Sequence, residues 1–473
     1  MARFTESQDA QVLQDLAAQL TQGRLVSSAA SMAGHSRDFA DWAESGAPVA
    51  VVIVAHAHEV QAVVQVCVAH GRPVVARGAG TGLAGAANAE DGWVVIAFEE
   101  MNRIVEVNSL ERYAVVQPGV INDDLRRAAA GKGLWYPPDP VSSAWSTIGG
   151  NVATNAGGLC CVKYGVTGDY VLELEVVTGT GDLVRVGRRT AKGVAGYDLA
   201  SLLVGSEGTL GIITEVTLRL RPSPKPARAI VGFFPSVESA GEAVRAVAEA
   251  GITPSTFELM DRHVIAAVEA MTPIGVDQGV AALLLAKIDD AGVEGDETAL
   301  AVATYFGESG ATWADQSSDP AEAEALFAAR RLSHTALERL GTVLSEDVCV
   351  PKSALPAMLV AVEVIAEKHD ILIATVAHAG DGNLHPLLIT PPGDQAARAR
   401  AQVAFAELMT QAIALGGTIT GEHGIGLLKR DGLLEELSDP VVSLHRQIKN
   451  ALDPAGILNP GKVLGPDEVD SPA

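Results

Sequence analysis

The sequence predicts a mixed α+β fold with more than one domain, and three observations support this prediction. Residues 47–220 contain short apolar runs separated by glycine turns, which is typical of strands joined by tight connections. Arg221-Pro-Ser-Pro-Lys-Pro226 is a proline-rich break that we interpret as a domain boundary. After this break, apolar runs of strand length alternate with longer helical segments, and the 473 residues are enough for roughly three domains of ordinary size.

The expected elements follow one another along the chain. Residues 1–46 are predicted to form an amphipathic helix and polar loops, because Val12, Leu13, Leu16 and Leu20 recur near helical spacing. Before the break we expect strands at 49–55 and 93–98, a hairpin around 179–182, and helices at 58–70 and 122–132. Beyond it we expect strands at 229–234, 281–288 and 372–377, and helices at 237–250, 320–340, 352–368 and 395–415.

Composition and charge narrow the class of protein. Apolar residues make up 48% and charged residues 19%, which is a globular composition. The net charge of −24 argues against nucleic acid and anionic membrane surfaces as partners. The four cysteines are too few for a disulfide framework and fit a reducing compartment. The N-terminus lacks the pattern of a signal peptide and the apolar runs are of strand length, so we expect a cytoplasmic protein, with peripheral membrane association as the alternative.

The first glycine cluster is Arg77-Gly-Ala-Gly-Thr-Gly-Leu-Ala-Gly85. It matches the G-x-G-x-x-G pattern of dinucleotide-binding folds, with Glu99 further on. Such folds need a helix directly after the glycines, but only residues 86–92 precede the next strand, so this interpretation fails. What remains is a strand followed by a tight loop whose backbone N–H groups can face an anion such as a pyrophosphate.

Two further segments favour a flat ligand. They are Ser146-Thr-Ile-Gly-Gly-Asn-Val-Ala-Thr-Asn-Ala-Gly-Gly158 and Gly205-Ser-Glu-Gly-Thr-Leu-Gly-Ile-Ile213. Their Gly, Asn, Ser and Thr residues let a backbone approach a ligand closely and form hydrogen bonds without charge. The second segment lacks the Gly-Lys-Ser/Thr of a phosphate-binding loop for ATP, so a nucleoside triphosphate is not indicated.

The strongest chemical pattern combines His378-Ala-Gly-Asp-Gly-Asn-Leu-His385 with Gly421-Glu422-His423-Gly424. Three imidazoles and a carboxylate in glycine-flanked segments are suitable ligands for a divalent metal, with one histidine to spare for proton transfer. The spacing is not His-Glu-x-x-His, which disfavours a zinc protease. Asp381 and Asn383 are candidates for orienting the imidazoles.

Taken together, these motifs resemble the vanillyl-alcohol oxidase-type flavoproteins, and in particular their D-2-hydroxyacid dehydrogenase branch. That branch includes D-lactate dehydrogenase, the glycolate oxidase FAD subunit and D-2-hydroxyglutarate dehydrogenase. The resemblance includes Lys163-Tyr-Gly165 and Leu458-Asn-Pro-Gly-Lys462, and covers nearly all of the chain after about residue 45. It implies an FAD-binding domain, an α+β substrate or cap domain, and a C-terminal segment that returns to the flavin. We place these at 47–223, 224–418 and 419–465, after the N-terminal segment 1–46 and before a tail, 466–473, that we expect to be disordered.

The resemblance also implies which residues hold FAD. The loop from Arg77 to Leu83 would hold the pyrophosphate, Ile213 would meet the ring, and Asn459 would close the site. That loop contains no histidine for a covalent link, so the FAD is expected to be non-covalent. The complete expected set is Arg77, Gly78, Ala79, Gly80, Thr81, Gly82, Leu83, Pro138, Asp139, Thr147, Ile148, Gly149, Gly150, Asn151, Gly157, Gly158, Gly165, Gly208, Ile213 and Asn459.

For the metal, the resemblance implies His378, His385 and Glu422 as ligands and His423 as the catalytic base. Zinc is the expected metal, with manganese and iron as alternatives. The metal would acidify the substrate hydroxyl, His423 would take its proton, and a hydride would pass to flavin N5. Arg330 matches the family's carboxylate-binding arginine, although Arg331 competes with it and Phe327 stands where the family commonly has Trp.

The substrate prediction is a D-2-hydroxy acid, with D-lactate or glycolate favoured. The acidic trio Ser345-Glu346-Asp347 stands where a D-2-hydroxyglutarate enzyme would carry a basic group for a second carboxylate. Lys352 or Arg339 could instead supply the basic group that a dicarboxylate substrate needs. A metal-free aldonolactone or sugar oxidase and a non-catalytic flavin-binding subunit are two further classes that the sequence leaves open. The expected partners are the hydroxy acid, an electron acceptor that is a quinone, a protein or oxygen, and a second copy in a homodimer.

Overall fold

The computed structural model describes residues 4–277, 279–317 and 320–465. The chain forms two compact units, which are described separately. The first unit comprises Met1–Ala156, Val166–Ser223 and Glu422–Ala473, and the second comprises Gly157–Gly165 and Pro224–Gly421. Among the described residues, no helix is long and apolar enough to cross a membrane.

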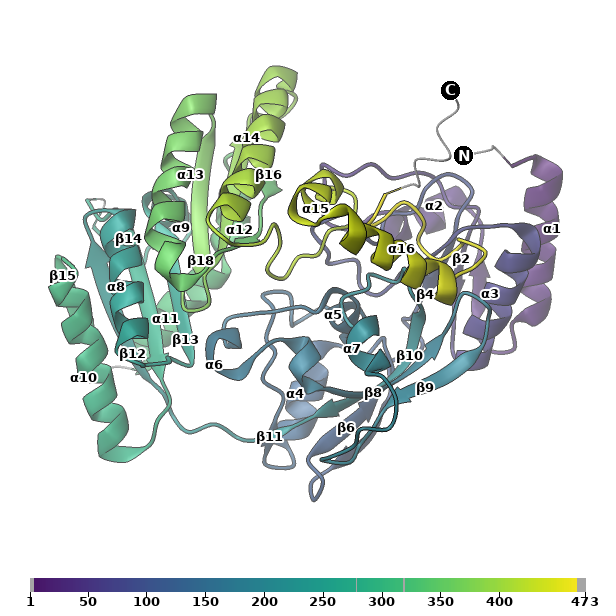
Figure 1. The fold of residues 1–473 in the computed structure, drawn as a ribbon, viewed down its shortest axis with the longest axis horizontal. Coiled ribbons are helices and arrows are strands. Elements are labelled where there is room, and N and C mark those ends of the chain that lie inside the picture. The colour runs from purple at the N-terminus through teal and green to yellow at the C-terminus, as the bar shows by residue number, and fades with distance from the viewer. Residues whose placement is uncertain (1–3, 278, 318–319, 466–473) are drawn as a thin grey trace. The chain divides into compact units, whose positions relative to one another are not determined.

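The first unit contains a small, mostly parallel sheet near the N-terminus. Its strand order is β1-β2-β4-β3, in which β4 pairs in parallel with both β2 and β3 (Figure 1). Buried valines on α3 and on the sheet form its core together with Val12 and Leu16 of α1, so the N-terminal helix packs by its apolar face. The bounds are α1 Glu6–Gln19, β1 Arg24–Val26, α2 Ala29–Met32, β2 Ala50–Ile53, α3 Ala57–His70, β3 Val74–Arg77 and β4 Val94–Ala97.

A second, antiparallel sheet completes the first unit. Its order is β5-β6-β10-β8-β9, with a separate β11-β7 pair. The hairpin expected around 179–182 joins β8 to β9. The bounds are β5 Ile104–Asn108, β6 Tyr113–Val116, α4 Asn122–Ala130, β7 Leu134–Trp135, α5 Ile148–Thr154, β8 Val171–Val177, β9 Leu183–Gly187, α7 Leu199–Leu203, β10 Ile212–Arg219, β11 Arg221–Pro222, α15 Arg430–Glu436 and α16 Asp439–Leu452.

The second unit is built on one large antiparallel sheet. Its order is β15-β12-β14-β13-β18-β19-β16, and β17 also pairs with β19. The strands are β12 Arg228–Phe234, β13 Thr256–Asp261, β14 Ala282–Ile288, β15 Trp313–Gln316, β16 Thr342–Ser345, β17 Val348–Cys349, β18 Leu372–His378 and β19 Asn383–Thr390. The helices are α6 Cys161–Tyr164, α8 Val237–Glu249, α9 Arg262–Met271, α10 Gly292–Glu308, α11 Pro320–Arg331, α12 Ser333–Glu338, α13 Leu355–His369 and α14 Gln395–Ala414.

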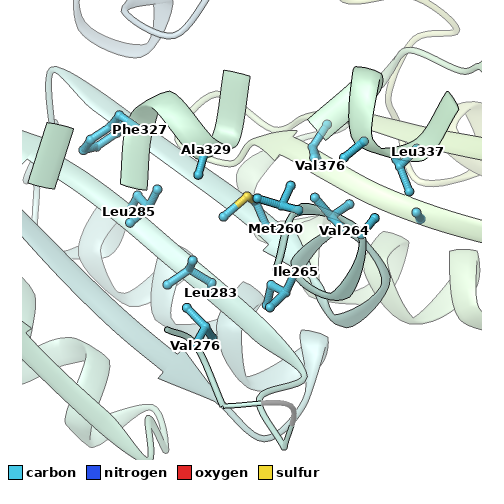
Figure 2. Packing of buried hydrophobic residues seen from close by; sticks show 14 of the residues in the cluster. Met260, Val264, Ile265, Val276, Leu283, Leu285, Phe327, Ala329, Leu337 and Val376 are labelled. Atoms are coloured by element: carbon cyan, nitrogen blue, oxygen red, sulfur yellow. The ribbon is translucent and has the colours of Figure 1, made fainter. Parts of the chain in front are cut away.

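Helices cover both faces of this sheet. On one face, Met260 of β13 and Leu285 of β14 pack with Val264 of α9, Phe327 of α11 and Leu337 of α12 in one buried cluster (Figure 2). On the other face, Phe234 of β12 packs edge-on against Phe306 of α10. Because successive strand residues point to opposite faces, every side chain of a central strand such as β13 is buried.

Most of the expected elements are present, with one clear correction. The helices expected at 58–70, 122–132, 237–250 and 395–415 correspond to α3, α4, α8 and α14. The single helix expected at 320–340 is wrong, because α11 ends at Arg331 and α12 begins at Ser333. The Ser333 hydroxyl donates a 2.7 Å hydrogen bond to the carbonyl of Arg330, and so competes with the regular helical bond at the break.

Candidate functional site

The first unit contains a hollow with five glycines among its twelve lining residues. Seven of the residues expected to hold a flavin line it: Arg77, Gly78, Thr147, Gly149, Gly150, Gly208 and Ile213. Five others that the sequence analysis did not single out join them: Ala76, Phe98, Pro118, Ala153 and Gly211. Phe98 directly follows β4 and Pro118 lies two residues after β6. Both could have been predicted from the sequence as residues that come just after a strand.

Several of these glycines are required because the backbone segments approach one another closely. A Cβ atom on Gly78 would lie 2.2 Å from Thr147 Oγ1, and one on Gly149 would lie 2.5 Å from Pro118 Cβ. Thr147 also caps α5 by accepting a hydrogen bond from the Gly150 N–H. The glycines therefore bring the loop after β3 against the start of α5, and any larger residue would displace one of the two.

Arg77 is the charged group of the hollow. Its guanidinium folds over Gly80, which has a φ of +71°, and Nη2 donates a 2.8 Å hydrogen bond to the Gly34 carbonyl. Burial lowers the pKa of this guanidinium, against the opposing charges of Asp38 and Glu99. Within the described part of the chain, Nη1 has no hydrogen-bond partner although it is buried. A buried cationic N–H in a glycine-lined hollow fits an anionic ligand such as a pyrophosphate.

The loop that follows Arg77 is tied to the C-terminal segment. Asn459 adopts a φ of +43°, and its amide Nδ2 donates to the carbonyls of Ala86 and Glu207 at 2.9 and 2.8 Å. Its backbone N–H donates to the Val74 carbonyl at 2.7 Å. Asn459 thus joins three segments of the first unit, and its role toward a flavin stays a prediction.

The other expected flavin residues have varied surroundings. Ile148 is fully buried in the core beside the antiparallel sheet, and the amide of Asn151 is buried nearby. Pro138 accepts a hydrogen bond from Asn122 Nδ2. Gly157, Gly158 and Gly165 belong to the second unit. Ala79, Thr81, Gly82, Leu83 and Asp139 lie in loops of the first unit and do not line the hollow.

In the second unit, the structure brings His378 and His385 together. His378 ends β18 and His385 lies on β19, and the hairpin register pairs His385 with Val376, two residues before His378. Strand residues two apart share a face, so both imidazoles lie on the same face, with ring centroids 5.1 Å apart. Both side chains are buried.

A carboxylate that sequence reasoning missed holds His378. Glu258 on β13 lies opposite His378 in the strand register and is completely buried. Its Oε1 lies 2.7 Å from His378 Nδ1, and its Oε2 lies 2.9 Å from Nη2 of Arg330. No sequence pattern joins Glu258 to residues more than seventy positions away, so only strand pairing could reveal this contact.

A second buried carboxylate organises the loop after α14. Asp347 Oδ2 accepts hydrogen bonds from Thr420 Oγ1 at 2.7 Å and from the Gly421 N–H at 2.9 Å. Its Oδ1 accepts a 2.6 Å bond from Asn383 Nδ2 and lies 3.6 Å from His385 Nδ1. Asp347 therefore fixes Asn383 and residues 420–421, which lie beside the predicted metal ligands in sequence, and both of its oxygens accept hydrogen bonds.

The two candidate carboxylate-binding arginines, Arg330 and Arg331, differ in burial and in their partners. Arg330 is 3% exposed and meets Glu258, whereas the half-exposed Arg331 pairs with Glu324 at 3.1 Å. Phe327, in place of a tryptophan, is buried in the hydrophobic cluster. Lys352 and Arg339 are both exposed.

Glu422 and His423 open the C-terminal part of the first unit. Glu422 Oε1 lies 3.9 Å from His423 Nε2, and both side chains are partly exposed. Just beyond them, Glu207 accepts hydrogen bonds from the N–H groups of Ile425 and Gly426 at 2.7 and 2.8 Å. Burial raises the pKa of Glu207 to about 7, even though these two donors oppose the shift.

Comparisons with known proteins define the class first. The family model described as "FAD binding domain" matches residues 48–187, and the model described as "FAD linked oxidases, C-terminal domain" matches residues 223–463. The structure of 4-ethylphenol oxidase from Gulosibacter chungangensis superimposes with a TM-score of 0.82, covering 98% of this chain and 99% of that one at 18% identity. p-Cresol methylhydroxylase gives 0.82 with 99% of each chain covered, also at 18% identity. The fold is that of the vanillyl-alcohol oxidase-type flavoproteins, as expected.

The relatives by sequence are more specific. The chain is 42% identical to the glycolate oxidase subunit GlcD of Bacillus subtilis over 89% of this chain and 90% of that protein. It is 35% identical to a D-lactate dehydrogenase of Anaerostipes hadrus (88% and 89% covered) and 32% identical to a D-2-hydroxyglutarate dehydrogenase of Stutzerimonas stutzeri (96% and 99%). The chain belongs to the FAD-linked oxidase family. The expectations of an FAD-linked oxidoreductase and of this family are thereby confirmed.

Proposed function

We propose that this enzyme oxidises a D-2-hydroxy acid to the 2-oxo acid with FAD as the first electron acceptor and a divalent metal at the substrate. The observation that carries the proposal is the buried pair His378 and His385, with Nδ1 of His378 held by Glu258. A carboxylate on one ring nitrogen is the usual arrangement of a histidine that binds a metal through the other. A sugar oxidase of the same flavin class would not need this pair.

FAD would be held by the glycine-lined hollow of the first unit. The buried Nη1 of Arg77 and the close approach of Gly78 to Thr147 suit a pyrophosphate and a flat ring system. FAD, when bound, supplies the two-electron acceptor that the side chains of a protein lack. The protein supplies binding and orientation, and we keep the full expected set from Arg77 to Asn459 as the proposed contacts.

The metal would be held by His378, His385 and Glu422. Glu422 directly follows Gly421, whose N–H is bound by Asp347, and Asp347 also approaches His385 within the second unit. Chain connectivity therefore supports Glu422 as the third ligand. A metal with these N and O ligands supplies a Lewis acid that lowers the pKa of a bound hydroxyl, and zinc, manganese and iron all accept such ligands.

Two residues would act on the substrate itself. His423, next to Glu422 in the chain, would accept the hydroxyl proton as general base, which typically contributes roughly 10²–10⁴-fold to a rate. Arg330 would bind the substrate carboxylate, because a guanidinium offers parallel N–H donors to two oxygens. Glu258 already balances part of the charge of Arg330, so the arginine is held in place before substrate arrives.

We favour a monocarboxylate, D-lactate or glycolate, as the substrate. The relatives named glycolate oxidase subunit and D-lactate dehydrogenase support this choice, and position 345 carries a small, buried serine in place of a basic residue. D-2-hydroxyglutarate remains the second candidate because a relative with that name covers 96% of this chain. Both exposed basic residues considered for it, Lys352 and Arg339, would have to reach a buried site.

The test is anaerobic addition of D-lactate, L-lactate, glycolate or D-2-hydroxyglutarate to the purified flavoprotein, following the absorbance of oxidised flavin. Bleaching by D-lactate or glycolate and not by L-lactate is the expected result. Bleaching by D-2-hydroxyglutarate alone would move the proposal to the second candidate. A normal flavin spectrum that no 2-hydroxy acid bleaches would contradict the proposed reaction.

A further inference from the structure

Glu258 is a buried carboxylate with two different functional partners. It lies on the central strand β13 with 0% exposure, and its two oxygens face His378 Nδ1 and Arg330 Nη2 at 2.7 and 2.9 Å. Taking a carboxylate out of water is costly unless its oxygens are paired. Here Oε1 has a hydrogen-bond partner in His378, the proposed metal ligand, and Oε2 has an ion-pair contact with Arg330, the proposed substrate-binding arginine.

The contact with His378 fixes which ring nitrogen carries the hydrogen. When Glu258 Oε1 accepts a hydrogen bond from His378 Nδ1, the hydrogen lies on Nδ1 and the lone pair of the neutral imidazole lies on Nε2. A metal binds an imidazole through that lone pair. Without Glu258 the imidazole could adopt either tautomer and rotate, which would weaken a metal site.

The contact with Arg330 fixes a second element. Arg330 is the penultimate residue of α11, close to the break between α11 and α12 at Leu332. Its guanidinium is 4% exposed and is held from β13 by Glu258 Oε2. One carboxylate thus ties the end of α11 to the end of β18, across the strand pairing of β13 with β18.

We propose that Glu258 is a positioning residue that sets both the tautomer of the metal-binding His378 and the orientation of Arg330 toward the substrate carboxylate. The proposal rests on the proposed function, because it assigns Glu258 a role in that same site. Glu258 touches neither substrate nor cofactor in this assignment. It acts through its two partners, so its loss should affect metal binding and substrate binding together.

Another buried carboxylate on the same strand provides a matched control. Asp261 ends β13, three residues after Glu258, and accepts hydrogen bonds from the N–H groups of His263, Val264 and Thr375. All of these partners are backbone groups that cap α9 and bind β18. Burial raises the pKa of Asp261 to about 7, and Asp261→Asn removes a buried carboxyl group from the same strand without touching an imidazole or an arginine.

The first measurement is the affinity of metal-free flavoprotein for Zn²⁺ and Mn²⁺, by competition with a chromophoric chelator, in wild type, Glu258→Gln, Asp261→Asn and His378→Ala. Glutamine has the same shape, but its neutral amide has a single oxygen, so it cannot both accept from His378 and form an ion pair with Arg330. We expect Glu258→Gln to weaken the metal affinity roughly ten- to hundred-fold and to raise the KM for D-lactate, while Asp261→Asn keeps the wild-type affinity.

The second measurement is independent of metal and of turnover. Nitrogen NMR of metal-free protein with ¹⁵N-labelled histidine reports the tautomer of each ring, and His378 is assigned from its missing signals in His378→Ala. We expect the Nδ1–H form in the wild type and a mixture of tautomers in Glu258→Gln. The Nε2–H form in the wild type would overturn the proposal directly.

The outcomes separate this proposal from the proposed function. If His378→Ala loses metal affinity while folded Glu258→Gln keeps it, the metal site stands and the role of Glu258 is overturned. If wild type and His378→Ala bind metal equally, the proposed metal site itself fails, and the role of Glu258 toward metal fails with it. If Asp261→Asn weakens the metal affinity as much as Glu258→Gln, loss of either buried carboxyl group of β13 causes the effect, and the specific role of Glu258 is overturned.

Discussion

The hollow of the first unit and the histidine cluster of the second unit both place polar groups away from water, but they do so in opposite ways. The hollow of the first unit is lined by five glycines, one arginine and mostly apolar side chains, and its shape depends on the absence of side chains at the glycines. The histidine cluster of the second unit depends on polar side chains that are present, with the carboxyl groups of Glu258 and Asp347 fully buried beside His378 and His385. We therefore expect that adding an atom disrupts the hollow, whereas removing a buried carboxyl group or imidazole disrupts the histidine cluster.

The largest expected effect comes from His378→Ala in the second unit. Loss of this proposed metal ligand would remove Lewis-acid assistance worth several kcal/mol, so flavin reduction by D-lactate should slow by roughly three orders of magnitude. The bound flavin should stay at the wild-type level, because the hollow is untouched. Stopped-flow absorbance measures the rate, and the flavin-to-protein ratio checks the second point.

A matched control for this variant is His369→Ala. His369 forms a similar imidazole–carboxylate pair with Glu407, 2.7 Å long, between α13 and α14 of the same unit. It should leave the rate of flavin reduction near that of wild type. Equal slowing in both variants would show that the loss reflects general damage to the unit.

The next effect is expected from Gly78→Ala in the first unit. A methyl group would lie 2.2 Å from Thr147 Oγ1, which forces the loop after β3 away from α5. We expect the FAD affinity to fall at least roughly tenfold, the equivalent of about 1.4 kcal/mol, while the metal content is retained. Fluorescence titration of flavin-free protein with FAD measures this.

Gly131→Ala serves as the comparison for that experiment. Gly131 ends α4 with a φ of −61°, and an added methyl would make only ordinary contacts at 3.5 and 3.7 Å. Its FAD affinity should equal that of wild type. Normal FAD affinity in Gly78→Ala as well would mean that the hollow is not the flavin site.

A smaller effect, on stability, is expected from Asp347→Asn. The amide cannot accept from Thr420, Gly421 and Asn383 together, and an unsatisfied buried group costs roughly 1–3 kcal/mol. Urea unfolding of metal-free protein should show a lower free energy of unfolding. Asp394→Asn, at the exposed N-cap of α14, should change it by only a few tenths of a kcal/mol because Asn caps as well as Asp. The same stability in both variants would refute the structural role of Asp347.

The last expected effect is confined to a pH window and is set by Glu207. Its pKa is raised from 4.5 to about 7, so between these values the folded state holds a proton that the unfolded state has released. Its contribution to stability is therefore present below pH 4.5 and is lost as the pH rises through 7, with a slope of at most about 1.4 kcal/mol per pH unit. In Glu207→Gln the free energy of unfolding should fall less steeply over this window. An unchanged slope would contradict the raised pKa.

The same contrast explains how much the sequence could predict. The glycine loops could be located because backbone requirements are local, and Arg77, Gly78, Thr147 and Gly149 indeed line one hollow. The pair of His378 and His385 was predictable because a hairpin joins them. Glu258 was not, since β13 carries no alternating pattern and all six of its residues are buried.

Further parts of the second unit escaped prediction for related reasons. Helix α9 follows β13 directly, with Asp261 serving both as the last strand residue and as the N-cap, so no turn residues separate the two. The acidic trio at 345–347 suggested repulsion of a second substrate carboxylate. Its last member, Asp347, instead holds residues 420–421, which lie more than seventy positions away in sequence. Contacts at such separations follow from strand order, which one sequence does not specify.

The most direct test of the central claim is reduction of the flavin by D-lactate under anaerobic conditions before chelation, after removal of metal with a chelator, and after Zn²⁺ or Mn²⁺ is added back, with L-lactate as the control. We expect rapid bleaching by D-lactate, its loss on chelation with the flavin still bound, and its return with metal, with no response to L-lactate at any stage. Undiminished bleaching by D-lactate in chelated protein shown to be free of metal would contradict the claim that flavin reduction depends on a metal held by the histidine cluster.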